Sequence, residues 1–253
     1  MTFNEFDAKM RVFETATDVC VLPEMFFVAR LDGRSFTRLT KDVLKLEAPF
    51  DVRFRDMMIA TTQSLMETGF DVRYAYIQSD EISILFSQSE SQFKRKLRKL
   101  ISVLAAEASA KFSLDAGVAA TFDCRISQLP NVDLVCDYFR WRSADSLRNS
   151  LNAHCYCAMR KGGFTAKQAT RRMVGLSVQG KHDLLFREFE TNFNDLPIWQ
   201  KRGVGLYWKT YQKQASNPIT GEKTTVSRRK INIDLEIPEK DAYSSLIEGL
   251  IKQ

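Results

Sequence analysis

Acidic side chains stand at the ends of apolar segments in the first half of the chain. Asp32 directly follows a short apolar run typical of a strand, and Asp80 and Glu81 lie in the polar turn of a predicted hairpin. Two carboxylates held close together repel each other, and their pKa values rise unless a cation lies between them. Mg²⁺ prefers such ligands, usually one or two carboxylates together with phosphate oxygens and water. Asp32, Asp80 and Glu81 are therefore candidate catalytic acids for two-metal nucleotidyl transfer.

Gly33 and the residues after it could bind a phosphate group. A residue without a side chain lets a phosphate or a metal ion approach the backbone, and its carbonyl can act as a ligand. The backbone amides of 33–37 open toward a predicted helix, where they could hold a triphosphate. Turns also favour Asp, Ser and Gly for conformational reasons, so each motif alone is better explained by local structure. Only their combination on neighbouring strands favours catalysis.

The hydrophobic pattern predicts the elements that must position these residues. An apolar period near 3.6 residues indicates a helix, and short β-branched runs indicate strands. The predicted elements of the first half are a strand at 25–31, a helix at 50–66, hairpin strands at 72–77 and 82–86, a helix at 93–112 and a strand at 121–129. This is the split βαβ, or ferredoxin-like, order, in which we expect the first strand to lie close to the second.

The second half of the chain has a mainly helical pattern. Its predicted elements are a helix at 137–160, a helix opened by a capping box at 165–168, a helix at 181–193, a strand at 204–211, a turn at 217–221 and a strand at 223–234. The sequence thus predicts an α+β protein with a ferredoxin-like βαββαβ core in 1–135. Residues 136–253 would form a helical half with a terminal β-hairpin, joined to the core as one compact unit.

The charge of the chain favours a polyanionic partner. Its 253 residues carry 37 Lys and Arg against 31 Asp and Glu, a formal charge of +6. Two basic runs, 94–99 and 228–230, are the strongest candidates for phosphate contacts. No apolar run is long enough to span a bilayer, so we expect a cytoplasmic protein without a membrane anchor.

Six short motifs follow one another along the chain. They are Arg30–Phe36, Tyr76–Ser83, Phe122–Arg125, Tyr138–Arg142, Leu185–Phe189 and Trp199–Gly203. They span roughly residues 5–212 and resemble the motifs of the tRNA-His guanylyltransferases and their guanylyltransferase-like relatives, which extend RNA in the 3′-to-5′ direction. Several ordered motifs over most of the chain make this resemblance specific.

The resemblance implies a palm-like catalytic core with two Mg²⁺ ions, as in ordinary polymerases. Asp32 and Asp80 match the metal-binding carboxylates, the Gly33 carbonyl would be a further ligand, and Glu81 is similar to the second acid of that turn. Nucleotide contacts are implied for Asp32, Gly33, Arg34, Ser35, Phe36, Thr37, Ser79 and Asp80. Contacts with triphosphate or tRNA are assigned to Lys94, Arg95, Lys96, Arg98, Lys99, Arg142, Arg148, Asn149, Arg228, Arg229 and Lys230.

The chemistry implied by the resemblance begins at a 5′-monophosphorylated RNA end, which ATP activates. The 3′-hydroxyl of an incoming nucleotide, such as GTP, then attacks the activated phosphate, and pyrophosphate is finally removed. The resemblance also implies a homo-oligomer, a dimer or a tetramer.

Two positions depart from the pattern of the eukaryotic members. Leu147 stands where their His-Ile-Asn-Asn-Leu-Tyr-Asn signature begins with histidine. This favours template-dependent addition to 5′-truncated tRNA over untemplated addition of guanosine to tRNA-His, which remains the alternative. Ala48 stands where relatives often carry a nucleotide-contacting lysine, and Lys45 could substitute for it.

Two functions of other classes use parts of the same pattern. A palm-fold nucleotide cyclase would need the paired carboxylates but no RNA-sized basic surface. A non-catalytic tRNA-binding protein would keep the basic runs and tolerate loss of the acids. The intact acids disfavour the second function, and the motifs in the helical half disfavour the first.

Overall fold

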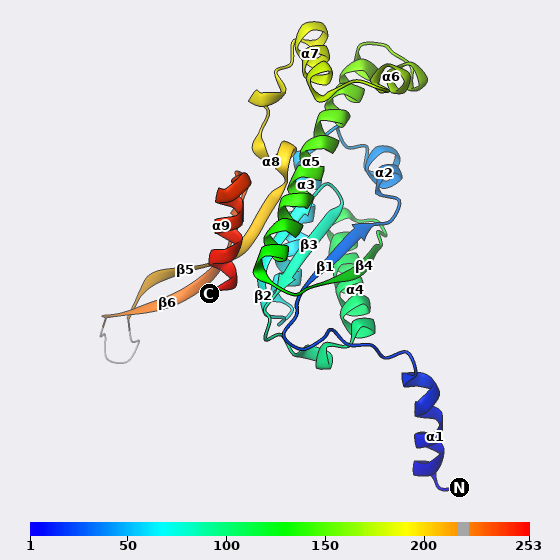
Figure 1. Ribbon diagram of the computed structural model, residues 1–253, viewed down its shortest axis with the longest axis vertical. Helices are drawn as coiled ribbons and strands as arrows, with labels where there is room; N and C mark the ends of the chain where they lie inside the picture. Colours follow the sequence, from blue (N-terminus) through cyan, green and yellow to red (C-terminus); the bar gives the residue numbers. More distant parts are fainter. Residues whose placement is uncertain (217–222) are drawn as a thin grey trace.

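The computed structural model of the chain, which describes residues 1–216 and 223–253, contains a six-stranded antiparallel sheet (Figure 1). The strands are β1 (Phe26–Gly33), β2 (Val72–Gln78), β3 (Glu81–Phe86), β4 (Phe122–Leu129), β5 (Val204–Ser216) and β6 (Lys223–Asp234). They lie in the order β4-β1-β3-β2-β5-β6. The first four strands have the ferredoxin-like arrangement, which confirms the predicted fold class. β1 pairs with β3 and β4 and not with β2, which corrects the expected neighbour of the first strand.

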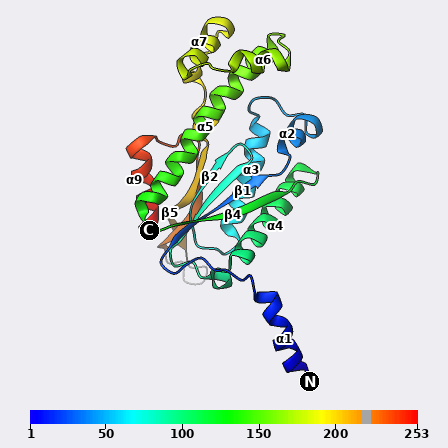
Figure 2. The same cartoon turned by 45° about the vertical axis from the view of Figure 1, so that its right-hand side comes forward.

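Helices cover both faces of the sheet (Figures 1 and 2). They are α1 (Phe3–Thr15), α2 (Phe36–Arg38), α3 (Val52–Glu67), α4 (Leu97–Ala116), α5 (Val132–Lys161), α6 (Ala166–Met173), α7 (Val178–Phe189), α8 (Ile198–Arg202) and α9 (Lys240–Ile251), with single turns η1 (Leu39–Val43), η2 (Gln92–Arg95) and η3 (Phe193–Asp195). One apolar core packs α3 and α4 on one face, and a second packs α5 and α9 on the other. Because both faces are buried, the central strands are continuous apolar runs.

Several predicted helix boundaries were wrong. α4 begins at Leu97 and not at Phe93, because Phe93 and Lys94 have left-handed backbone angles with φ of 53° and 54°. α5 begins earlier than predicted, after Asn131, whose side chain accepts a hydrogen bond from the amide of Leu134 at 2.9 Å. The predicted helix at 181–193 is α7, which begins after Ser177, followed by the separate turn η3. The sequence pattern did not predict α1, α8 or α9, and it gave no bounds for the helix after Gly33, which is α2. The predicted turn at 217–221 lies outside the described residues.

The terminal hairpin belongs to the sheet of the first half. β5 pairs with β2 only from Val204 to Leu206, while its pairing with β6 continues as far as Ser216. Beyond Leu206 the two strands therefore pair only with each other and project from the body (Figure 1). We call the projecting residues 207–216 and 223–232 the arm. β5 is longer than the predicted strand at 204–211 because it continues along this arm.

α1 stands apart from the rest of the protein in both views (Figures 1 and 2). It buries none of its residues, and Phe3, Phe6 and Phe13 are exposed. Within residues 1–216 and 223–253, no helix has the length and apolar character required to cross a membrane.

Candidate active site

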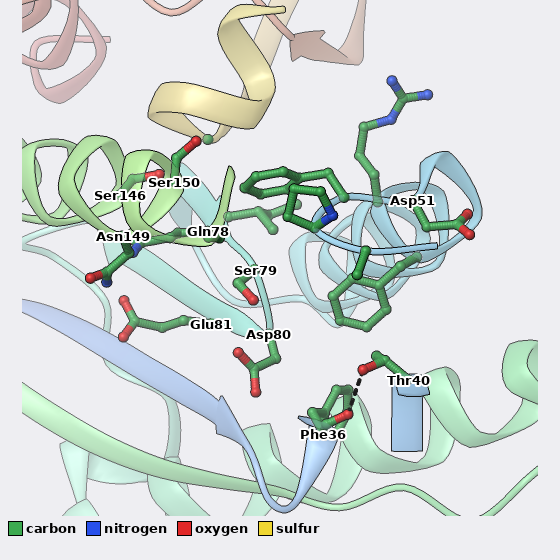
Figure 3. Close-up of a pocket in the computed structure, with 18 of the residues that line it drawn as sticks. Phe36, Thr40, Asp51, Gln78, Ser79, Asp80, Glu81, Ser146, Asn149 and Ser150 are labelled. Carbon is green, nitrogen blue, oxygen red and sulfur yellow. Dashed lines mark hydrogen bonds between the residues drawn. The ribbon is translucent and has the colours of Figure 1, made fainter. Parts of the chain in front are cut away.

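A cleft of about 650 Å³ opens where β1 ends (Figure 3). α5 forms one wall, and residues 36–55 form the opposite wall. The turn that joins β2 to β3, with Ser79 and Asp80 at its centre, forms the floor. The cleft has the size of a small-molecule site and has acids at one end.

The fold brings Asp32 and Asp80 together, as the sequence predicts. The Gly33 amide, next to Asp32, donates a hydrogen bond to the Asp80 carbonyl at 3.0 Å, so the end of β1 is tied to the turn. Both acids line the cleft. Burial raises the pKa of Asp80, and the nearby Asp32 carboxylate raises it further.

This pair of acids fits a hard divalent cation. No Lys or Arg in the described part of the chain forms an ion pair with Asp32 or Asp80, so no cation of these residues offsets their mutual repulsion. Residues 1–216 and 223–253 also contain no group of three His, Cys, Asp or Glu side chains that could hold a metal by themselves. Two neighbouring carboxylates suit Mg²⁺, which commonly completes its shell with water and substrate phosphates. Gly33 itself does not line the cleft.

Gly33 is required by the packing of Phe36. A Cβ atom at Gly33 would lie 2.4 Å from the Phe36 ring. That ring is buried and packs against Phe112 and Phe122, with centroid separations of 5.0 and 4.9 Å. The glycine therefore lets the chain turn sharply from β1 into α2 at the mouth of the cleft.

Fewer residues of the predicted phosphate-binding turn at 33–37 are available to a ligand than the sequence suggests. The Gly33 amide donates to Asp80, and the Arg34 amide donates to the carbonyl of Thr121 at 2.9 Å. Phe36 and Thr37 line the cleft, whereas Arg34 and Ser35 do not. Only the backbone of Phe36 and Thr37 therefore fits the predicted role, because the amides of Gly33 and Arg34 already have partners and Ser35 lies outside the cleft.

Lys41 lines the cleft, where the sequence had suggested Lys45. Lys41 and Thr40 line the cleft, while Lys45 is exposed outside it, with a left-handed φ of 49°. The short turn η1 orients this segment, and the Thr40 hydroxyl donates to the Phe36 carbonyl at 2.8 Å (Figure 3). Ala48 also lines the cleft. The sequence pattern could not locate Lys41, because the apolar residues of η1 repeat with neither the period of a strand nor that of an α-helix.

Glu81 has a different environment from Asp80. Arg142 donates to both of its carboxylate oxygens at 2.8 Å, and the Arg30 Nε lies 3.6 Å from Oε2. Both Glu81 and Arg142 are buried. Arg142 lines the cleft, but its Nε and Nη2 are already bound by this carboxylate and are not free for the predicted phosphate contact.

The wall formed by α5 contains polar residues at helical spacing. Ser146, Asn149 and Ser150 line the cleft (Figure 3), and Asn149 donates to Asp145 at 3.2 Å. Arg148 also binds Asp145 but lies outside the cleft and is exposed. The structure thus brings Asn149 to the acids and leaves Arg148 on the surface.

Aromatic residues at the far end of the cleft were not predicted as site residues. Phe50 and Trp199 meet edge to face, with ring centroids 5.9 Å apart, and both line the cleft with Tyr156. Arg55 lies over the Trp199 ring at 4.9 Å. These residues come from α3, α5 and α8 and the loops beside them, so no local pattern connects them in the sequence.

The basic run 94–99 lies at the opposite end of β1 from Asp32. Arg95 donates to the carbonyl of Met25, which precedes β1, at 2.6 Å, and Lys96 and Arg98 pair with Asp18. β1 has eight residues, which at about 3.3 Å each separates its ends by roughly 25 Å. Within one chain these cations do not reach the acids, which corrects their predicted contact with a triphosphate held there. Lys94 and Lys99 belong to the same distant end.

The second basic run lies on the arm, where strand alternation divides it. In the ladder, Tyr211 lies opposite Arg228 and Lys209 opposite Lys230, so these four side chains share one face. Arg229 points to the other face, where it lies over the Trp208 ring at 5.1 Å.

Comparison with known proteins gives one consistent family. The family model for tRNAHis guanylyltransferase matches residues 7–130, and the family model for the Thg1 C-terminal domain matches residues 133–242. The chain is 30% identical over 240 residues to a probable tRNA(His) guanylyltransferase of Mus musculus, covering 88% of this chain and 80% of that protein. A bacterial tRNA(His) guanylyltransferase-like protein in complex with ATP has a TM-score of 0.78 and 27% identity, covering 98% of this chain and 100% of that one. The corresponding complex with GTP has a TM-score of 0.73, with the same identity and coverage. This chain belongs to the tRNAHis guanylyltransferase family.

Proposed function

We propose that this protein is a Mg²⁺-dependent nucleotidyltransferase that adds nucleotides, in the 3′-to-5′ direction and under the direction of a template, to the 5′ end of truncated tRNA. The class of enzyme follows from the family. The main structural support for this function is the pair of acids, Asp32 and Asp80, at one end of a cleft large enough for a nucleotide. Relatives bound to ATP and to GTP support nucleoside triphosphates as the ligands of this cleft.

The proposed reaction has two steps in which an oxygen nucleophile attacks a phosphorus atom. In the first, an oxygen of the RNA 5′-monophosphate attacks the α-phosphorus of ATP, and pyrophosphate leaves. In the second, the 3′-hydroxyl of the incoming nucleotide attacks the activated 5′ phosphorus, and AMP leaves. Mg²⁺ held by Asp32, Asp80 and the Gly33 carbonyl would offset the charge of the phosphates at this centre. Thr37, Lys41 and Asn149 line the same cleft as the acids, which supports a role for them in binding the triphosphate.

The experiment that tests this function is extension of a 5′-truncated, 5′-phosphorylated tRNA by the wild type, Asp32→Ala and Asp80→Ala. We expect loss of at least about a hundredfold in rate for either variant, because several kcal/mol of charge stabilisation would be removed. Asp137→Ala is the matched control, since Asp137 is exposed on α5 and pairs only loosely with Arg140 at 3.6 Å. Equal rates in all four proteins would refute the role of the acids, and no extension by the wild type with any nucleotide would refute the polymerase function.

Untemplated addition of guanosine to tRNA-His is the alternative, favoured by the names of the relatives. Changing the tRNA base opposite the added nucleotide separates the two. A templated enzyme incorporates the complement of each base, whereas an untemplated enzyme incorporates G throughout. Formation of a cyclic nucleotide without RNA would instead indicate the cyclase.

The same proposal includes RNA contacts on the arm and assembly of the chain into a dimer or tetramer. The arm exposes Arg228 and Lys230 beside Lys209 on one face, where like charges lie opposite each other and an anion would relieve their repulsion. Assembly is supported by the exposed apolar side chains of α1, including Phe3 and Phe13. Light scattering after size-exclusion chromatography tests it, and a monomer at micromolar concentration would exclude the oligomer.

A further inference from the structure

Glu81 follows Asp80 in the chain, but its carboxylate is bound by Arg142 of α5, the helix that forms one wall of the cleft. Its Oε1 accepts from Arg142 Nε and its Oε2 from Arg142 Nη2, both at 2.8 Å. Arg30 adds a third cationic group, 3.6 Å from Oε2. Glu81 is 8% exposed and Arg142 6%. Both oxygens of the carboxylate are therefore engaged by a planar guanidinium in the paired geometry that makes such contacts strong and directional.

This ion pair joins the two structural units that enclose the cleft. Glu81 is the first residue of β3 and is directly linked to Asp80, while Arg142 lies in α5. Their positions are 61 residues apart in the sequence. This ion pair thus connects the turn that carries a proposed metal ligand to α5, in addition to the hydrogen bonds of Gln78 to the backbone of Arg142 and Ser146.

The contact continues along α5 to residues that line the cleft. Arg142 Nη2 lies 3.3 Å from Asp145 Oδ2, which also accepts from Asn149 Nδ2 at 3.2 Å. The Cζ atom of Arg142 lies over the Trp141 ring, 4.7 Å from its centre. Figure 3 shows Asn149 close above the Glu81 carboxylate. Any movement of Arg142 would therefore be transmitted to Asp145 and Asn149.

We propose that Glu81 is a positioning residue and not a metal ligand: through Arg142 it fixes α5 against the turn that carries Asp80, and so sets the width of the cleft in which the nucleotide binds. The inference rests on the proposed function, because it assumes that the nucleotide occupies this cleft. A metal bound by Glu81 would compete with Arg142 for both carboxylate oxygens and leave the buried guanidinium with Asp145 as its remaining acid, which is unfavourable.

The test compares Glu81→Gln, Arg142→Gln and the double variant with the wild type. Three quantities are measured: the affinity for Mn²⁺ without nucleotide, by electron paramagnetic resonance; the affinity for ATP; and the melting temperature. Each single substitution removes the two-bond partner of a buried charge: Arg142 would keep only Asp145 at 3.3 Å, and Glu81 would keep only Arg30 at 3.6 Å. We therefore expect a lower melting temperature and ATP binding weaker by about tenfold or more. In the double variant two neutral amides can pair, and we expect most of both losses to be recovered. Mn²⁺ affinity should stay within about twofold of the wild type in Glu81→Gln, since no metal ligand is lost.

Two control variants make the result specific. Glu188→Gln breaks an exposed ion pair with Arg172 between α6 and α7, so it tests the effect of a Glu to Gln change away from the cleft. Asp80→Asn reports the loss of a proposed metal ligand. If Glu81→Gln loses Mn²⁺ affinity as Asp80→Asn does, or if the losses of the two single variants simply add in the double variant, the positioning role is wrong. If Asp80→Asn binds Mn²⁺ normally, the metal assignment of the proposed function fails, while ATP affinity and melting temperature still decide the role of Glu81. Should a single variant not fold, the double variant decides by itself, because the positioning role of Glu81 predicts that the double variant folds and binds ATP.

Discussion

At the scale of single residues, the acids of the cleft impose a cost that a metal ion would remove. Burial and the Asp32 carboxylate raise the pKa of Asp80 above that of the unfolded chain. The native state therefore binds this proton more tightly than the unfolded state, and ionisation of Asp80 destabilises the fold. The destabilisation is complete above the raised pKa and disappears as the pH falls through it toward the unfolded value of 3.8.

Asp80→Asn should therefore melt at a higher temperature than the wild type at pH 8 without divalent metal. In a chain of this size about 1 kcal/mol corresponds to a rise of roughly 2–4 °C. The difference should shrink as the pH is lowered toward 4. Mg²⁺ should raise the melting temperature of the wild type only. Calorimetry with and without Mg²⁺ measures both effects, and an equal response of the two proteins to Mg²⁺ would contradict the metal assignment.

Gly33→Ala should weaken both the fold and nucleotide binding. The added methyl group would lie 2.4 Å from the Phe36 ring, which must then move from its packing against Phe112 and Phe122. Overpacking of this kind typically costs about 1–3 kcal/mol. Gly249→Ala is the matched control, since no atom lies within 4 Å of its added methyl group and α9 should tolerate it. Thermal melting and titration with ATP measure the effects, and equal behaviour of the two variants would contradict the role given to Gly33.

The sequence predicted which acids lie together in the cleft but not their partners. Asp32 and Asp80 could be found because each ends or joins a strand with a clear apolar pattern. The role of Glu81 could not, because Arg142 lies 61 residues away on a helix whose polar and apolar residues both face the protein. Lys45 and Lys41 are equally plausible in the sequence, and only the path of η1 places Lys41 in the cleft.

At the scale of elements, long-range backbone contacts explain why local patterns failed. The apolar period continues N-terminal to Leu97, but the Leu97 amide donates to the Val19 carbonyl at 2.8 Å and Arg95 accepts from the Val21 amide at 3.0 Å. These contacts use the groups that a longer helix would need for its own first turn. The predicted strands were more accurate, because central strands buried on both faces have short and distinct apolar runs.

α9, which the sequence did not predict, is fixed to the sheet by a hydrogen bond between two buried tyrosines. The hydroxyl groups of Tyr74 in β2 and Tyr243 in α9 lie 3.0 Å apart. Tyr243→Phe leaves the Tyr74 hydroxyl buried without this partner, so we expect a loss of about 1–3 kcal/mol in the free energy of unfolding. The double variant Tyr74→Phe/Tyr243→Phe removes both polar groups and should recover most of the loss. Denaturant unfolding measures the three variants, and a double variant less stable than the single one would show that the hydrogen bond is not the main contact.

At the scale of the whole molecule, the excess of positive charge lies away from the acids. The run 94–99 lies at the far end of β1, where Asp18 pairs with Lys96 and Arg98. The arm carries a second group of cations well outside the sheet of the core (Figure 1). Net charge alone predicted a polyanionic partner, which agrees with the family, but the distribution separates the proposed RNA-binding surface from the proposed reaction centre.

The arm gives the sharpest test of this division, because neighbouring residues point to opposite faces. Arg228 and Lys230 share a face with Lys209 and Tyr211, whereas Arg229 lies on the other face over Trp208. If the first face binds the RNA backbone, Arg228→Ala and Lys230→Ala should each weaken tRNA binding, with about the same effect for all tRNA sequences. Each should also reduce the slope of log affinity against log salt by about one, since each removes one phosphate contact. Arg229→Ala removes the same charge from the same strand and should change neither quantity, so filter binding at several salt concentrations separates a specific face from net charge alone. An equal loss in all three variants would show that the arm acts only through its total charge.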